Sequence, residues 1–480
     1  MSKKKAEKKG VRLGAVAAVV AVVLAAGLLI IGWRVFVKRS SEEAFRLMNE
    51  GQKLTSEGKP VEALEIYRKL DGMFYVRRDR QLSGWVKQYL GLCYAQMSAV
   101  GDREKNLEKA RAMYESALDI ADAAGNDREK ANVSLSLGNI LLEQTDYGDG
   151  HARALESLKR FEFAESYFTV DGEPQEYARL RVRTGMARVK LSEYEDRERN
   201  LKLALAAFRE SKSLYPVDRS PYERAETMLN IAKAYFMLSD VRDAIKNLEA
   251  SDAEFDELLE IKSVRFDPNY RASVLSDRAN VLRRLAELKR DPGAYHLAVE
   301  QYRDALGVLK LEHFPIYFAL VNSGLGDTYM KLAEMESRAE NLKLAAAAYQ
   351  DALKVYTKDG MPDYFAKTNN SMGAAYAYLA LIEDTAENTR RSVAAFRNAL
   401  KVYKIDTHPA EYAAANRNIG NSLMRLVPVD RRRETLEDAF DAFTRALTVY
   451  KKDPESEEYT STMGLLVRIE EVLRSLDEQK

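Results

Sequence analysis

Cysteine, histidine and proline are scarce in this sequence, and neither sign of charge prevails. Its 480 residues include one Cys, four His and 11 Pro, and 74 Lys and Arg are balanced by 74 Asp and Glu. A single cysteine excludes a disulfide framework and any multi-cysteine zinc or iron–sulfur site. The composition, 46% hydrophobic and 31% charged, is that of a folded protein and excludes long disorder or a collagen-like chain.

The charges are unevenly distributed along the chain. Residues 1–39 carry nine Lys and Arg against one Glu, so residues 40–480 carry 65 positive and 73 negative side chains, a net charge of −8. Binding to duplex nucleic acid requires a clustered positive field that neutralises phosphates. A mildly acidic body therefore predicts that nucleic acid is not a partner.

One long hydrophobic run lies near the N-terminus. Residues 13–33 contain no charge and are bracketed by Arg12 and Arg34. A helix of that length spans about 31 Å, which matches a hydrocarbon core of about 30 Å. The alternative, a cleaved signal peptide, has an apolar core of about 7–15 residues, whereas this run continues through residues 28–31 beyond its small residues. No lipobox cysteine follows, so we expect an uncleaved membrane anchor.

Basic residues on the two sides of this run predict its orientation. Six Lys and Arg lie in residues 1–12, and only three lie in residues 34–40. The positive-inside rule then places residues 1–12 in the cytoplasm, as a basic tail, and the chain beyond the linker 34–40 outside it. That compartment is the periplasm if the membrane is a bacterial inner membrane.

A repeat of 47 residues runs through the rest of the chain. Nine positions separated by this step are all aromatic, although only 9% of the chain is aromatic: Tyr67, Tyr114, Phe161, Phe208, Phe255, Tyr302, Tyr349, Phe396 and Phe443. A second row holds the smallest residues: Gly91, Gly138, Gly185, Ala232, Ala279, Gly326, Gly373 and Gly420. A third row holds six of the prolines: Pro174, Pro221, Pro268, Pro315, Pro362 and Pro409.

Each repeat has the pattern of two antiparallel helices. In one repeat, helix A is expected over residues 364–382, and helix B is expected to start at a Thr385 cap and end near residue 403. Ser337 and Glu340 have the spacing of a capping box at the start of the preceding helix B. Because no hairpin can bury its apolar stripe alone, consecutive hairpins must stack into a solenoid.

The order of these residues resembles the tetratricopeptide repeat (TPR) family. The family's helix A carries a small residue and an aromatic three residues later, as at Gly326 and Tyr329; its helix B carries alanine, aromatic and alanine, as at Ala345, Tyr349 and Ala352. The step of 47 departs from the family's usual 34 and is similar to that of kinesin light chains and some bacterial TPR proteins.

The resemblance implies an all-α fold. We expect a right-handed superhelical α-solenoid of about nine antiparallel helix pairs over residues 41–476, preceded by one transmembrane helix. Residues 456–475 have the pattern of a final, polar capping helix.

Residues with catalytic or metal-binding potential are few, and a packing or loop explanation is preferred for each. Cys93 is expected to be an inert, buried thiol, because nothing nearby would lower its pKa. His151, His296, His313 and His408 have no i+3 or i+4 partner suited to metal binding. No phosphate-binding loop, nucleophile elbow or HExxH motif occurs. The sequence therefore predicts a non-enzyme without cofactor or metal.

A partner-binding groove is what remains. In the family, helix A lines the inner wall, and positions one, four and five after the small residue face the groove. Positions one and five supply the candidate binding residues: Lys190, Lys233, Arg284, Lys331, Arg425, Asn139, Asn280 and Asn421. These cations favour acidic segments or a C-terminal carboxylate, and the asparagines favour peptide backbone. The alternative is a solvated face whose charges keep the groove soluble.

These features predict a membrane-anchored scaffold that binds other proteins. In a bacterium it would suit a cell-envelope complex such as a flagellar motor, a secretion or export machine, or a helper of the translocon. Two alternatives remain open. A chaperone-like module would hold client polypeptides in the groove, and a self-associating protein would stack its hairpins end to end.

Overall fold

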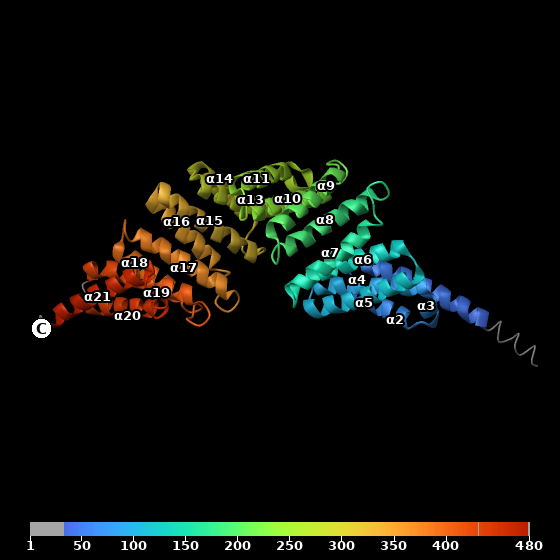
Figure 1. Cartoon of the computed structure of the whole chain (residues 1–480), viewed down its shortest axis with the longest axis horizontal. Coiled ribbons are helices and arrows are strands. Elements are labelled where there is room, and N and C mark those ends of the chain that lie inside the picture. The colour runs from blue at the N-terminus through green and yellow to red at the C-terminus, as the bar shows by residue number, and fades with distance from the viewer. Residues whose placement is uncertain (1–32, 431, 479–480) are drawn as a thin grey trace, which may run out of the picture. The chain divides into compact units, whose positions relative to one another are not determined.

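The computed structural model describes residues 33–430 and 432–478, and every regular element in these ranges is helical (Figure 1). The chain divides into two compact units, one ending at Tyr215 and one starting at Pro216. The predicted all-α class is confirmed. The handedness of the predicted superhelix stays a prediction.

The first unit contains four helix pairs among its described residues. Helix 33–56 pairs with α2, and α3 follows as a short extra helix; the other pairs are α4 with α5, α6 with α7, and α8 with α9. Their bounds are α2 Pro60–Gly72, α3 Phe74–Arg78, α4 Arg80–Ser98, α5 Arg103–Ala124, α6 Asp127–Glu143, the 3₁₀ helix η1 Gln144–Asp146, α7 Gly150–Glu165, α8 Pro174–Leu191 and α9 Arg197–Leu214.

The second unit contains five helix pairs and a final helix among its described residues. The pairs are α10 with α11, α13 with α14, α15 with α16, α17 with α18, and α19 with α20, and α21 packs on α20. Their bounds are α10 Pro221–Ser239, α11 Ala244–Glu260, α12 Lys262–Arg265, α13 Pro268–Lys289, α14 Pro292–Val308, α15 Pro315–Met335, α16 Arg338–Ala352, α17 Pro362–Leu379, α18 Thr385–Ala399, α19 Pro409–Asp430, α20 Arg433–Tyr450 and α21 Glu457–Glu478.

The recurring prolines start the A helices. Each of the six is the first residue of its helix, in α8, α10, α13, α15, α17 and α19. Proline suits this position because its fixed φ is already helical and its missing N–H would have no intrahelical acceptor. One sequence position thus sets where helix A begins in six successive hairpins.

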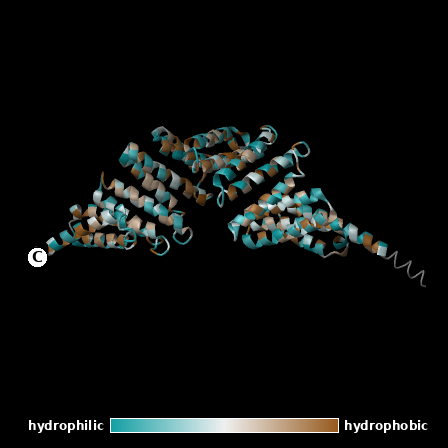
Figure 2. Ribbon diagram, in the orientation of Figure 1, coloured by the Kyte–Doolittle hydropathy of each residue, from teal (hydrophilic) through white to brown (hydrophobic). Residues whose placement is uncertain are grey.

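The nine recurring aromatic rings fill the hairpin cores. All are buried, with 5% or less of each residue exposed. In the hairpins with a glycine on helix A, the ring of helix B lies directly over it; a Cβ at Gly326 would be 2.7 Å from Tyr349 Cε1, and one at Gly373 would be 2.9 Å from Phe396. The glycine therefore lets the ring enter, which explains the two rows 23 residues apart. Figure 2 shows the result, helices that carry both hydrophobic and hydrophilic sides.

The turn between helices A and B is closed in a way that the sequence analysis did not predict. Ser337 has φ of 43° and makes no side-chain cap, so the predicted capping box with Glu340 is wrong. A capping side chain requires an extended backbone, which this left-handed residue lacks. Instead, the Asn341 amide donates to the Glu336 carbonyl at 2.9 Å. Asparagines at the same repeat position make the same bond in four other hairpins: Asn106, Asn200, Asn247 and Asn388.

The expected cap at Thr385 is also displaced. The N-cap of α18 is Asp384, which has a left-handed backbone, and Thr385 is the first helical residue. The final helix was expected over residues 456–475, and α21 at Glu457–Glu478 confirms it.

The predicted transmembrane helix, residues 13–33, lies outside the described residues except for Trp33. Among the helices that are described, none is long and apolar enough to cross a bilayer. Residues 34–40, predicted to be a linker, are helical and continuous with the helix that runs to residue 56.

Candidate interaction surfaces

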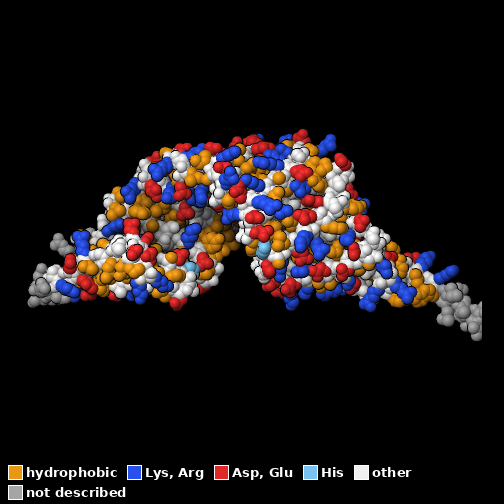
Figure 3. Space-filling view, viewed as in Figure 1, with side chains coloured by type: hydrophobic (Ala, Val, Ile, Leu, Met, Phe, Trp, Pro, Cys, Tyr) orange, Lys and Arg blue, Asp and Glu red, His pale blue; other side chains and the backbone are white. Residues whose placement is uncertain are grey.

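Four of the five predicted groove cations are ion-paired between neighbouring A helices or their turns. The pairs are Lys190 with Asp146 at 3.0 Å, Lys233 with Asp277 at 3.0 Å, Arg284 with Asp240 at 3.1 Å and Lys331 with Glu287 at 4.0 Å. Each joins residues 44 positions apart, so the pairs repeat with the hairpins. The three pairs in the second unit therefore form a charge-balanced ladder, and the first unit holds one such pair. Figure 3 likewise shows basic and acidic side chains interspersed over the visible faces.

Lys190 is the most fully enclosed of these cations. Its ammonium contacts Glu193 at 2.9 Å as well as Asp146. Desolvation acts to lower the pKa of Lys190, but the hydrogen bonds to both carboxylates outweigh it, and the pKa is raised. Lys190 thus stays charged and engaged within its own unit.

Arg425 differs from the other four. Its guanidinium donates to the Ala377 carbonyl at 3.2 Å. Partial burial lowers the pKa of Arg425, and the neighbouring Tyr378 opposes that effect. Its role in the fold is to tie α19 to α17.

The predicted asparagines have different surroundings. The Asn280 oxygen accepts a hydrogen bond from the Tyr302 hydroxyl at 2.8 Å, and its amide donates to the Ser276 carbonyl. Asp327, at the same repeat position, accepts from Tyr349 at 2.6 Å. In these two hairpins, whose recurring ring is tyrosine, this position thus serves the hairpin core, whereas Leu92 occupies it in the hairpin of Tyr114. Asn139 and Asn421, whose hairpins carry Phe161 and Phe443, lack that bond and are half-buried.

A second surface, which the sequence analysis did not identify, is a row of exposed apolar side chains. It lies nine residues after the small residue of helix A, where helix A meets its turn. In the second unit the row, named here the turn row, consists of Val241, Leu288, Met335 and Ile382, each between 40% and 45% exposed. In the first unit the same position holds Val100, Tyr147 and Tyr194. A single exposed leucine is ordinary, but an apolar residue at the same position of four successive hairpins in the second unit makes this position a candidate interface.

The turn row and the predicted cations share one face. Arg284 and Leu288 are four residues apart on α13, and Lys331 and Met335 are four apart on α15, so each pair lies on the same side of its helix.

A second ladder of ion pairs involves the residues that follow three of the four members of the turn row. It joins the residue after the turn row to helix B of the preceding hairpin: Lys289 with Glu249, Glu336 with His296, and Glu383 with Lys343. Leu288 and Met335 thus lie along the chain between residues whose side chains are already ion-paired.

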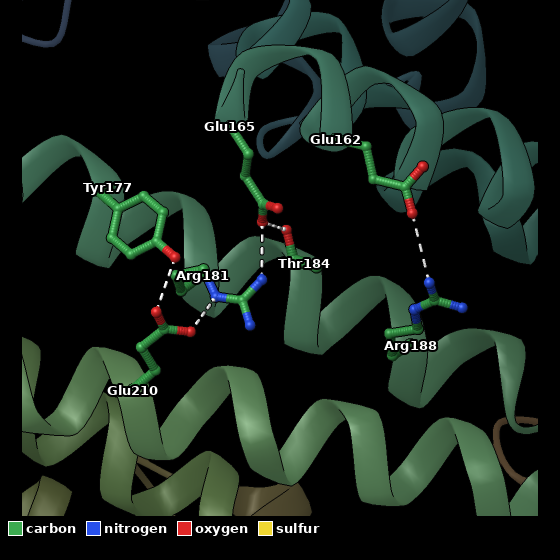
Figure 4. A network of polar contacts seen from close by, with 7 residues as sticks. All are labelled: Glu162, Glu165, Tyr177, Arg181, Thr184, Arg188 and Glu210. Atoms are coloured by element: carbon green, nitrogen blue, oxygen red, sulfur yellow. Dashed lines mark hydrogen bonds and ion pairs between the residues drawn. The ribbon is translucent and has the colours of Figure 1, made fainter. Parts of the chain in front are cut away.

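A partly buried polar network in the first unit has the residue types of an active site (Figure 4). Arg181 on α8 bridges Glu165 of α7 at 3.0 Å and Glu210 of α9 at 2.9 Å. Each carboxylate also accepts a hydrogen bond from a hydroxyl: Glu165 from Thr184 and Glu210 from Tyr177, both at 2.7 Å. Desolvation, helped by Glu210, raises the pKa of Tyr177 to about 12. Because every group is engaged by another, the network clamps three successive helices together.

Cys93 is buried in a hairpin core, and His151 and His408 each lie beside a single carboxylate. Cys93 is fully buried, and desolvation raises the pKa of its thiol to about 11, which agrees with the expected inert thiol. His151 lies 3.1 Å from Glu195, and His408 lies 3.6 Å from Asp363. Within residues 33–430 and 432–478, no group of three or more His, Cys, Asp or Glu side chains is placed to hold a metal ion.

No family model and no curated protein matches the sequence. Solved structures that resemble it include the C-terminal part of a TPR repeat-containing protein from Cytophaga hutchinsonii, at 16% identity over 64% of this chain and 94% of that one, with a TM-score of 0.40. The apo form of RapI gives 11% identity over 90% and 98%, with a TM-score of 0.48.

A third solved structure is a signal-transduction ATPase with a TPR sensor from Pyrococcus horikoshii. It gives 15% identity over 86% of this chain and 66% of that one, with a TM-score of 0.37. TPR-repeat proteins are thus among the structural neighbours, and the hairpins themselves show the TPR-like repeat that the sequence predicts. At these identities the likeness is one of fold alone.

Proposed function

We propose that the protein is a membrane-anchored scaffold that binds another protein along the turn row and the cations beside it. The observation that carries this proposal is the constancy of the row, which keeps an apolar side chain exposed in four successive hairpins of the second unit. Exposing these side chains contributes nothing to the hairpin cores, which are filled by the buried rings. An exposed apolar row bordered by polar residues is typical of an interface for another protein.

The ion pairs beside the row determine the kind of partner. Arg284 and Lys331 already contact Asp240 and Glu287, so an acidic partner must exchange with carboxylates that are in place. Such exposed pairs are each worth about 0–1 kcal/mol, so exchange costs little. We therefore propose that apolar contacts supply most of the affinity, and that Lys233, Arg284 and Lys331 of the second unit set register and selectivity.

Replacing the turn row is expected to abolish binding without unfolding the protein. Changing Val241, Leu288, Met335 and Ile382 together to serine should lower capture of the natural partner from solubilised membranes by at least tenfold. The matched control changes four other exposed apolar residues of the same unit to serine: Tyr222, Phe266, Ile316 and Tyr317. Helicity by circular dichroism should be unchanged in both. Undiminished capture by the turn-row variant would reject the proposed surface.

A second candidate, a chaperone-like module for client polypeptides, is favoured by the same exposed Leu, Met and Ile side chains. The two functions differ in selectivity. A scaffold should capture one defined set of proteins, whereas a client-binding module should suppress aggregation of unrelated unfolded proteins at stoichiometric amounts. Aggregation of an unfolded reporter enzyme, followed by light scattering, distinguishes them.

We further propose that residues 13–33 anchor the chain, with residues 1–12 in the cytoplasm and the hairpins outside it. The uncharged length and the flanking basic residues support this proposal. A reporter enzyme that works only outside the cytoplasm, fused after Lys480, should be active, and a reporter that works only in the cytoplasm should be inactive there. The reverse pattern would overturn the orientation.

A further inference from the structure

A cluster of exposed rings lies where the described chain begins. Trp33 and Phe36, on the first helix, meet Phe74 of α3, with ring centroids 5.6 Å apart for Trp33 and Phe74 and 6.5 Å apart for Phe36 and Phe74. All three remain 44–51% exposed. Two chain segments about 40 residues apart thus meet in one aromatic surface, with Val37, Ser40 and Tyr75 lining a shallow depression between them.

Six exposed cations lie within six residues of these rings along the chain: Arg34, Lys38, Arg39, Arg77, Arg78 and Arg80. The Arg78 guanidinium lies 4.7 Å from the centre of the Phe74 ring, and Arg77 donates to the Asp71 carbonyl. None of the six forms an ion pair with a carboxylate of the described residues. This contrasts with the hairpin stacks, where Lys190 and Arg181 each contact two carboxylates.

We propose that this aromatic and basic surface rests on the bilayer and binds anionic phospholipid headgroups. The proposal rests on the anchoring role of residues 13–33 in the proposed function, because that run ends at Trp33. Tryptophan rings favour the headgroup level of a membrane. Arginine and lysine close to an anionic surface are attracted to it, and aromatic side chains beside them enter the interface.

Helix α3 contributes residues to this surface that do not belong to the proposed anchor. Arg77 and Arg78 on α3, and Arg80 just after it, are far from residue 33 in sequence, yet the ring contacts hold α3 beside the first helix. Asp79, the acidic residue among them, accepts a hydrogen bond from the Leu82 N–H as the cap of α4. The fold therefore adds three cations and a ring to the end of the anchor, and a second contact fixes the first hairpin against the lipid.

Quenching of a single tryptophan tests this contact in the full chain. The chain has two tryptophans, so Trp33→Phe and Trp85→Phe with Phe74→Trp leaves one reporter on α3. The chain is reconstituted into phosphatidylcholine vesicles with or without about 30% phosphatidylglycerol, including lipids that carry a nitroxide at the headgroup. We expect strong quenching of the reporter with the anionic lipid, reduced by at least half when Arg77, Arg78 and Arg80 are changed to Gln.

The matched control places the only tryptophan elsewhere in the same unit. It combines Trp33→Phe and Trp85→Phe with Tyr167→Trp and keeps Phe74, and its fluorescence should remain unquenched. Flotation on a density gradient measures anchoring separately. A chain that floats with the vesicles while its α3 reporter stays unquenched would overturn the bilayer contact alone. A chain that does not float would overturn both proposals.

The reporter substitution itself is checked by a second label. Arg78→Cys labelled with a polarity-sensitive dye should shift to the blue on anionic vesicles, and Cys93 is too buried to compete for the label. The absence of any shift would contradict the proposal.

Discussion

Tyr349→Ala is expected to destabilise the hairpin of α15 and α16 by about 3–5 kcal/mol, the usual cost of removing a buried aromatic side chain. The ring is 1% exposed and lies over Gly326, and its hydroxyl donates to Asp327 at 2.6 Å. Hydrogen exchange of the α15 and α16 amides should accelerate by about a hundredfold or more, since each 1.4 kcal/mol is a factor of ten. Exchange within twofold of the wild type would contradict the packing described here.

A second substitution shows whether the glycine and the ring act as a pair. In the wild type, Gly326→Ala places a Cβ 2.7 Å from the ring and should destabilise. In the Tyr349→Ala background the ring is gone, so the same change should stabilise by about 1 kcal/mol, the difference in helix propensity. Tyr349→Phe is the control that keeps the ring, as in the five hairpins that carry Phe there. A Gly326→Ala effect of the same sign in both backgrounds would show no pairing.

Alkaline pH is expected to unfold the hairpins between about pH 10 and pH 12. Burial raises the pKa of Tyr302, Tyr295 and Tyr356 to about 12, and that of Tyr349 well above its ordinary value of 10. Below pH 10 these hydroxyls are protonated in both states, so stability is unaffected. Above pH 10 the unfolded chain loses protons that the folded chain retains, so stability falls until the folded tyrosines ionise.

The size of this effect is large for a fully buried hydroxyl. For Tyr302, whose pKa rises from 10 to about 12 on folding, the free energy of unfolding should fall by roughly 2–3 kcal/mol by pH 12. Exposed tyrosines also contribute to the tyrosinate absorbance near 295 nm, so only the contribution of the buried tyrosines should appear together with the loss of helix content by circular dichroism. Lysines also titrate in this range, so coincidence of the two signals is the decisive feature. Tyrosinate that forms fully while helicity is retained would refute the expectation.

The sequence predicted the hairpin cores because one physical constraint repeats. A ring on helix B needs a small residue on helix A, so Gly326 with Tyr349 and Gly373 with Phe396 mark both helices of their hairpins. The turn was misread at Ser337 because its left-handed backbone, which disables the cap, depends on how two packed helices connect. Sequence spacing alone does not report that conformation.

The surface was predicted less completely than the core. The cations at the fifth position were found, but their acidic partners, such as Asp240 for Arg284, lie in another hairpin. Pairing across 44 residues follows from stacking geometry and not from helical periodicity. The turn row carried a usable signal, because stepping by 47 residues from Val241 gives Leu288, Met335 and Ile382. Only exposure in the folded hairpins shows that this row faces outward.

Site-specific photo-cross-linking in the native membrane tests most directly that the turn row is the binding surface. A benzophenone amino acid at Met335 should form a defined adduct with one partner protein on irradiation. The same probe at Tyr222, exposed in the same unit but outside the row, should not form that adduct. If the Tyr222 probe captures the same protein and the Met335 probe captures none, the partner binds elsewhere on the scaffold and the turn row is not its site.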